Sequence, residues 1–181
     1  MAAERLTGVL LVGGDSTRFG SPKALAVYGD ETLAQRAWRV LGKTCDERIA
    51  VGKAGELDLP FPVVDDGTPV RAPISGVVAG LAAAPTDLCV VLPVDCPLVT
   101  VAALRTLADA CAGADAAVTQ TGPLPGAYRK TALPVLQRRL AAERLSLREA
   151  LDELDARKVD MDVALLANVN TADDLQRLVG Q

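Results

Sequence analysis

Two basic residues and several glycines lie close together near the start of the chain, directly after an apolar run that ends at Val12. Gly13 and Gly14 follow this run, and the polar stretch beyond them contains Arg18 and Lys23. Glycines at the end of a buried strand expose backbone N–H groups that can bind phosphate oxygens. The two basic side chains can neutralise phosphate charge. This combination predicts a binding site for a nucleoside triphosphate.

Two common glycine-rich phosphate loops do not fit these residues. A P-loop has its lysine directly after the last glycine, whereas Lys23 lies three places after Gly20. The dinucleotide fingerprint G-x-G-x-x-G opens a helix, but the glycine spacing differs here and Pro22 would interrupt that helix. The simpler alternative is a strand-to-loop turn with solvated charges. It is disfavoured because the glycines and both basic residues occur together.

An aspartate follows a second apolar run. Residues 88–92 are almost wholly apolar, as expected of a central parallel strand, and Asp95 comes shortly after them, between Pro93 and Pro97. Ligands of open α/β sheets bind at the carboxyl ends of the strands. A rigid carboxylate at such an end can hold Mg²⁺ that bridges triphosphate oxygens. The alternative is that Asp95 caps the next helix, for which Thr100 is better placed.

The elements that must position these residues alternate between short β-branched runs and longer helical patterns. This order predicts a three-layer α/β fold with a mostly parallel central sheet. Strands are predicted at 7–12, 47–52, 61–64, 88–93, 115–119 and 159–164. Helices are predicted after four capping residues, Thr32, Thr100, Ser146 and Thr171. The stretch 122–126, with two prolines and two glycines, is predicted to be a loop.

The composition narrows the range of functions. The 181 residues predict one domain over 1–181, and the net charge of −4 argues against nucleic acid as the main ligand. The absence of histidine excludes a histidine-based zinc site, and the four cysteines lack C-x-x-C spacing. Free thiols suit a reducing cytosol, so a cytoplasmic location is expected. No segment is long and apolar enough to predict a membrane span.

The glycine loop at 10–25 resembles the signature of nucleotidyltransferases related to the molybdenum cofactor guanylyltransferases, the MobA-like family. Further segments resemble that family in the same order, at 63–81, 90–100, 123–136, 146–151 and 168–175. The resemblance covers nearly the whole chain. It implies a Rossmann-like nucleotidyltransferase fold and a Mg²⁺-dependent reaction. In that reaction the phosphate of molybdopterin attacks GTP, pyrophosphate leaves, and molybdopterin guanine dinucleotide forms.

The resemblance also implies roles for individual residues. Arg18, Lys23 and Asp95 would be catalytic, with Asp95 as the magnesium ligand. The implied nucleotide-binding residues are Val12, Gly13, Gly14, Arg18, Lys23, Asp65, Asp66, Gly76 and Asp95. The choice between Asp65 and Asp66 stays open at this point. Asn168 and Asn170 are candidates for the acceptor site, although they could equally shape the turn before the last helix.

Two departures from the family pattern leave the base uncertain. Lys53 follows Gly52 where the family often has asparagine, and Ala72 precedes Pro73 where glycine is usual. Gly13 favours GTP, because the cytidylyl members of the family tend to have alanine there. The alternatives are a CTP-dependent molybdopterin cytidylyltransferase, a transferase acting on a sugar phosphate or another phosphate, and a non-catalytic nucleotide-binding protein. Whether the product passes to a carrier or to a cofactor-receiving enzyme also stays open.

Overall fold

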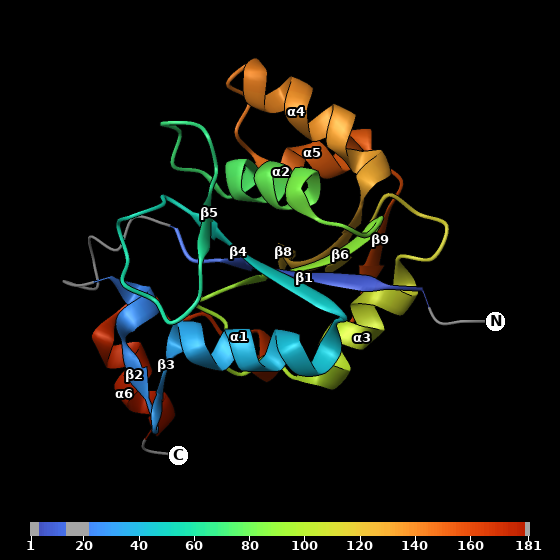
Figure 1. The fold of residues 1–181 in the computed structure, drawn as a ribbon. Helices are drawn as coiled ribbons and strands as arrows, with labels where there is room; N and C mark the ends of the chain where they lie inside the picture. The colour runs from blue at the N-terminus through green and yellow to red at the C-terminus, as the bar shows by residue number, and fades with distance from the viewer. Residues whose placement is uncertain (1–3, 14–21, 180–181) are drawn as a thin grey trace.

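A computed structural model describes residues 4–13 and 22–179 of the chain. Its middle layer is a seven-stranded sheet with the strand order β5-β4-β1-β6-β8-β7-β9 (Figure 1). The strands are β1 (Leu6–Leu11), β4 (Glu47–Gly52), β5 (Val63–Asp65), β6 (Leu88–Pro93), β7 (Ala116–Thr119), β8 (Gly122–Arg129) and β9 (Ala156–Val159). Within this sheet only β8 runs antiparallel to its neighbours. A short hairpin, β2 (Val27–Tyr28) and β3 (Glu31–Thr32), lies outside the sheet.

Helices cover both faces of this sheet (Figure 1). One face carries α1 (Leu33–Thr44) and α3 (Val101–Ala110), and the other carries α2 (Pro73–Ala83), α4 (Leu133–Ala141) and α5 (Leu147–Ala150). The final helix, α6 (Ala172–Val179), contributes Leu175 to the core on the α1 side. Short 3-10 turns are η1 (Lys23–Leu25), η2 (Lys130–Ala132), η3 (Leu151–Glu153) and η4 (Val163–Leu166). The predicted three-layer, mostly parallel α/β fold is confirmed.

Strand β1 contributes to the core on both faces of the sheet, because alternate side chains of a strand point to opposite faces. Leu10 packs with the α1 and α3 side, whereas Val9 and Leu11 pack with the α2 side. Helix α2 comes unusually close to β1. A Cβ on Gly80 would lie 2.5 Å from a methyl of Val9, and one on Gly76 would lie 2.8 Å from a methyl of Leu11. These two glycines therefore let α2 pack directly over the strand.

The capping residues begin the helices as predicted. The Thr32 side chain accepts a hydrogen bond from the backbone N–H of Gln35, and Thr100 accepts one from Ala103. Thr171 likewise accepts from the N–H of Asp174 at the start of α6. Ser146 begins a helix of only four residues, which continues as η3. Among the residues that the structure describes, no helix is both long and apolar enough to cross a membrane.

Two local predictions are wrong. The stretch 122–126 is the first part of β8 rather than a loop. It pairs with β7 through a register shift between Val118 and Thr119. The two prolines lie within this shift and have no partner on β7. The strand predicted at 159–164 instead lies at 156–159. The apolar run after it forms η4, because the carboxylate of Asp162 accepts a hydrogen bond from the N–H of Ala164 and starts a turn.

Candidate active site

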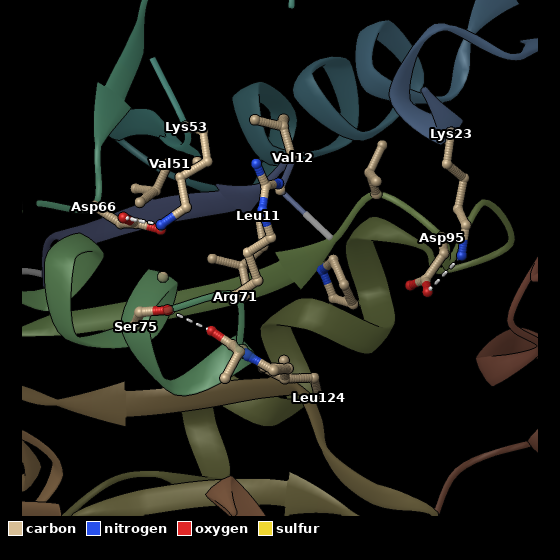
Figure 2. A pocket seen from close by; sticks show the side chains of 17 residues that line it. Leu11, Val12, Lys23, Val51, Lys53, Asp66, Arg71, Ser75, Asp95 and Leu124 are labelled. Atoms are coloured by element: carbon tan, nitrogen blue, oxygen red, sulfur yellow. Dashed lines mark hydrogen bonds and ion pairs between the residues drawn. The ribbon is translucent and has the colours of Figure 1, made fainter. Parts of the chain in front are cut away.

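The carboxyl ends of four neighbouring strands surround a cavity of about 310 Å³ (Figure 2). The chain leaves β1 through α1 on one face to reach β4, and it returns from β5 through α2 on the opposite face to reach β6. The strand order thus reverses around β1, and open α/β sheets bind ligands at such a crevice. The cavity is lined by Leu11, Val12, Gly13, Lys23, Val51, Gly52, Lys53, Asp66, Arg71, Ala72, Pro73, Ser75, Gly76, Pro93, Val94, Asp95 and Leu124.

Lys23 and Asp95 meet at one end of the cavity, although they are far apart in the sequence (Figure 2). The Lys23 ammonium lies 3.4 Å from a carboxylate oxygen of Asp95 and also 3.4 Å from the side-chain oxygen of Asn170. The side chains of Lys23 and Asp95 are 16% and 26% exposed, so a ligand in the cavity can reach both. A basic group beside a carboxylate suits a site that holds both phosphate and a cation.

The backbone holds this end of the cavity together. The carbonyl of Asp95 accepts a hydrogen bond of 2.8 Å from the N–H of Val169, which brings the segment before α6 against the loop after β6. The thiol of Cys96 lies 3.0 Å from the side-chain oxygen of Asn168. Burial raises the pKa of this thiol far above its usual value, so Cys96 stays protonated and acts as a packing residue.

The opposite end of the cavity contains a second ion pair, between Lys53 and Asp66 (Figure 2). The Lys53 ammonium donates to both carboxylate oxygens of Asp66, at 2.6 and 2.8 Å. It also donates to the backbone carbonyls of Thr68 and Val70. The side chain of Asp66 is only 7% exposed. Lys53 thus fixes the loop that leads from β5 toward α2.

The structure separates the two adjacent aspartates, Asp65 and Asp66. Asp66 lines the cavity, whereas Asp65 is exposed and shapes the turn outside it. The Asp65 carboxylate accepts hydrogen bonds from the N–H groups of Gly67 and Ala54, at 2.8 and 3.0 Å. These bonds lower the pKa of Asp65, which keeps it ionised as the acceptor of the turn.

Most of the remaining sequence-predicted residues also lie at the cavity. Val12 and Gly13 line it, and Gly76 lines it while also packing against Leu11. Asn168 and Asn170 are both exposed, and of the two only Asn170 contacts Lys23. Gly14 and Arg18 lie outside the described residues.

The cavity residues that were not predicted from the sequence include Lys53, Arg71, Ser75 and Leu124. Lys53 was noticed only as a departure from the family pattern, and Arg71 belongs to the other departing segment. These two departures were the features of the sequence that could have pointed to Lys53 and Arg71. Leu124 was missed because its segment was predicted to be a loop, whereas β8 carries it to the cavity.

The chain is similar to known proteins in sequence and in fold. The profile of the MobA-like NTP transferase domain matches residues 8–159, which include every residue that lines the cavity. The chain belongs to the MobA-like NTP transferase family. Like other members of the family, it is a nucleotidyltransferase.

Individual relatives match nearly the whole chain. A Chloroflexus aggregans protein named "Probable molybdenum cofactor guanylyltransferase" is 31% identical, and the match covers 94% of this chain and 92% of that protein. The crystal structure of the molybdopterin-guanine dinucleotide biosynthesis protein A of Archaeoglobus fulgidus superposes with a TM-score of 0.81 at 22% identity, over 96% of this chain and 97% of that one. A Mycobacterium tuberculosis protein solved in complex with manganese has a TM-score of 0.67 at 24% identity, over 98% and 99%. Both structures share the three-layer nucleotidyltransferase fold.

Proposed function

We propose that this MobA-like protein is a Mg²⁺-dependent guanylyltransferase that transfers GMP from GTP to the phosphate of molybdopterin and releases pyrophosphate. The observation that carries the proposal is the contact between Lys23 and Asp95 at the carboxyl ends of β1 and β6. It combines a phosphate-binding cation with a carboxylate in one partly exposed site. The names of curated relatives, such as the Chloroflexus aggregans protein, support the choice of molybdopterin as acceptor.

The residues present fit a magnesium ion. Mg²⁺ is usually held by one or two carboxylates, with substrate phosphates and water completing its octahedral shell. Asp95 supplies such a carboxylate, and the described residues contain no group of three or more acidic, cysteine or histidine side chains that could hold a metal ion without a substrate. The manganese complex of the mycobacterial relative supports a divalent cation on this fold. When bound, Mg²⁺ would neutralise charge on the triphosphate oxygens.

The chain's own groups would supply binding and orientation. Lys23 would neutralise charge that develops on the phosphate oxygens, and the backbone N–H at Gly13 would donate to them. An oxygen of the acceptor phosphate would attack the α-phosphorus of GTP as the bond to the β-phosphate oxygen breaks. Because a phosphate monoester is already largely ionised near neutral pH, the acceptor needs no general base. A chain without histidine can therefore carry out this reaction.

The spacing of the two ion pairs supports a nucleotide lying across the strand ends. Three steps between neighbouring strands separate β5 from β6. At about 4.8 Å per step, the two ends are roughly 14 Å apart. This span is on the scale of an extended nucleoside triphosphate. With the phosphates beside Lys23 and Asp95, the base would lie toward Asp66, where carboxylate and backbone groups can form hydrogen bonds to it.

A second candidate keeps the chemistry and changes the nucleotide. Lys53 and Ala72 both line the cavity, and both depart from the pattern of the family. These two departures are the reason to test CTP and ATP beside GTP. The alternative enzymes are a cytidylyltransferase and a transferase that acts on another phosphate.

Pyrophosphate release tests the proposal directly. Purified protein is mixed with molybdopterin, Mg²⁺ and one of GTP, CTP or ATP, and each nucleotide is also tested without molybdopterin. We expect release with GTP that requires both molybdopterin and Mg²⁺. A preference for CTP would replace the guanylyl assignment with the second candidate. No release with any nucleotide, from protein that is folded and binds molybdopterin, would refute nucleotidyl transfer to this acceptor.

A further inference from the structure

Lys53 is almost completely engaged by other parts of the chain. Its side chain is 15% exposed, and its ammonium donates to the carboxylate of Asp66 and to the carbonyls of Thr68 and Val70. An ammonium has three donors and no acceptor. These contacts therefore occupy its hydrogen-bonding capacity, so Lys53 acts on a ligand through the groups that it holds.

The groups held by Lys53 reach the cavity through Asp66, which lines it, and through Val70, which contacts the lining residue Ser75. The carbonyl of Val70 accepts from Lys53 at 3.1 Å and from the hydroxyl of Ser75 at 3.3 Å, and Ser75 itself lines the cavity. The loop after β4 is also joined elsewhere to the end of β5 and to the loop after β5. Glu56 pairs with Arg71 at 2.5 and 3.3 Å, and the N–H of Ala54 donates to Asp65. The loop after β4 is thus bound at three places to the end of β5 and the loop that follows it.

A lysine has a positive charge and a length that the asparagine often found here in the family lacks. Its positive charge offsets that of Asp66, whose side chain is 7% exposed and would otherwise be an uncompensated buried charge. Its length also lets one group bridge Asp66 and two carbonyls beyond it. Removing the ammonium would release the carboxylate and the loop together, while Lys23 and Asp95 at the other end would keep their contact.

We propose that Lys53 is a positioning residue that fixes Asp66 and the loop 66–71 in the shape that recognises the nucleoside. This inference rests on the proposed function in requiring a nucleotide in the cavity, but it does not depend on which base is preferred. Lys53 would set the affinity for the nucleoside and leave binding of the triphosphate group to Lys23 and Asp95.

Binding measurements with two kinds of probe separate these contributions. Titration calorimetry with Mg²⁺ compares inorganic tripolyphosphate with GTP, CTP and ATP, in the absence of acceptor. For Lys53→Met we expect the affinity for the best-bound nucleotide to fall by about tenfold or more, which is equivalent to at least about 1.4 kcal/mol. The affinity for tripolyphosphate should stay within about threefold of that of the wild type. In turnover assays KM for the nucleotide should rise while kcat changes little, as for lost ground-state binding.

Three further variants make the result specific. Lys130→Met removes another lysine that holds a backbone carbonyl, that of Ala84 at 2.7 Å, outside the cavity, and should leave nucleotide binding unchanged. Lys53→Arg keeps the charge and should restore much of the affinity. The double variant Lys53→Met/Asp66→Asn removes both buried charges. It should recover thermal stability without recovering nucleotide affinity.

The possible outcomes are distinguishable. If Lys53→Met weakens the binding of tripolyphosphate as much as that of the nucleotide, or leaves nucleotide binding unchanged, the positioning role is wrong. Recovery of full nucleotide affinity in the double variant would also refute it, because the effect would then be one of folding alone. If the wild type binds no nucleotide better than tripolyphosphate, the proposed function itself fails.

Discussion

Replacing Lys23 with methionine would remove the ammonium beside Asp95 and keep a side chain of similar length. At about 3 Å from a phosphate oxygen and an effective dielectric constant of about 20, one unit charge contributes about 5.5 kcal/mol of attraction. Part of this attraction acts equally on bound GTP and on the transition state. Removing one group that stabilises developing charge typically lowers kcat by about 10² to 10³-fold. We expect a loss of turnover in that range.

The same substitution should cost little stability. The contact between Lys23 and Asp95 is 3.4 Å long, and both side chains are partly exposed, so water can solvate the remaining carboxylate. Partly solvated ion pairs of this kind contribute at most about 1 kcal/mol. The free energy of unfolding should therefore change by no more than about that amount.

Single-turnover pyrophosphate release and urea unfolding measure the two effects separately. Lys43→Met, on the exposed surface of α1 and outside the cavity, is the matched control and should retain turnover. Turnover of Lys23→Met within about threefold of the wild type would refute the role of Lys23 in phosphate binding. A loss of stability far above 1 kcal/mol would show that its main role is structural.

Three further predictions test the site and the fold. Asp95→Asn should lower turnover by about 10² or more and raise the Mg²⁺ concentration needed for half-maximal rate; an unchanged Mg²⁺ titration would argue against Asp95 as a ligand. Gly80→Ala places a methyl against Val9, at 2.5 Å from its Cγ1, and should destabilise the protein by about 1–3 kcal/mol in urea. Hydrogen bonds from Arg39, above all, lower the pKa of Glu31 from its usual 4.5. Glu31 therefore contributes stability above about pH 4.5 that is lost as the pH falls through the lowered pKa. Glu31→Gln should lower the unfolding midpoint at about pH 7 but not at about pH 2, and equal losses at both would contradict the pair.

The central strands were predictable because their environment is simple. The strands at 47–52 and 88–93 begin and end where the sequence predicted, and β1 differs by one residue at each end. β1 and β6 are buried on both faces, and such strands need mostly apolar runs, which few other elements contain. In β4 only the last three residues, 50–52, are buried, so its prediction depended on a shorter apolar run. The strands β8 and β9 were harder to predict, for reasons of their own sequences. β8 contains prolines, and the run after β9 is apolar but begins with a residue that caps a turn.

The sequence by itself indicated the local chemistry of this protein. Glycines after an apolar strand and an aspartate after another predict a phosphate site, because the groups that bind phosphate and metal lie at strand ends whatever the strand order. Only the tertiary structure decided which groups meet. The order of strands in the sheet is not their order in the chain, so it brings Lys23 to Asp95 and Lys53 to Asp66 at opposite ends of one cavity. It also decided between Asp65 and Asp66, because successive side chains at a strand end point to opposite sides and the pairing of β5 with β4 determines which side faces the cavity.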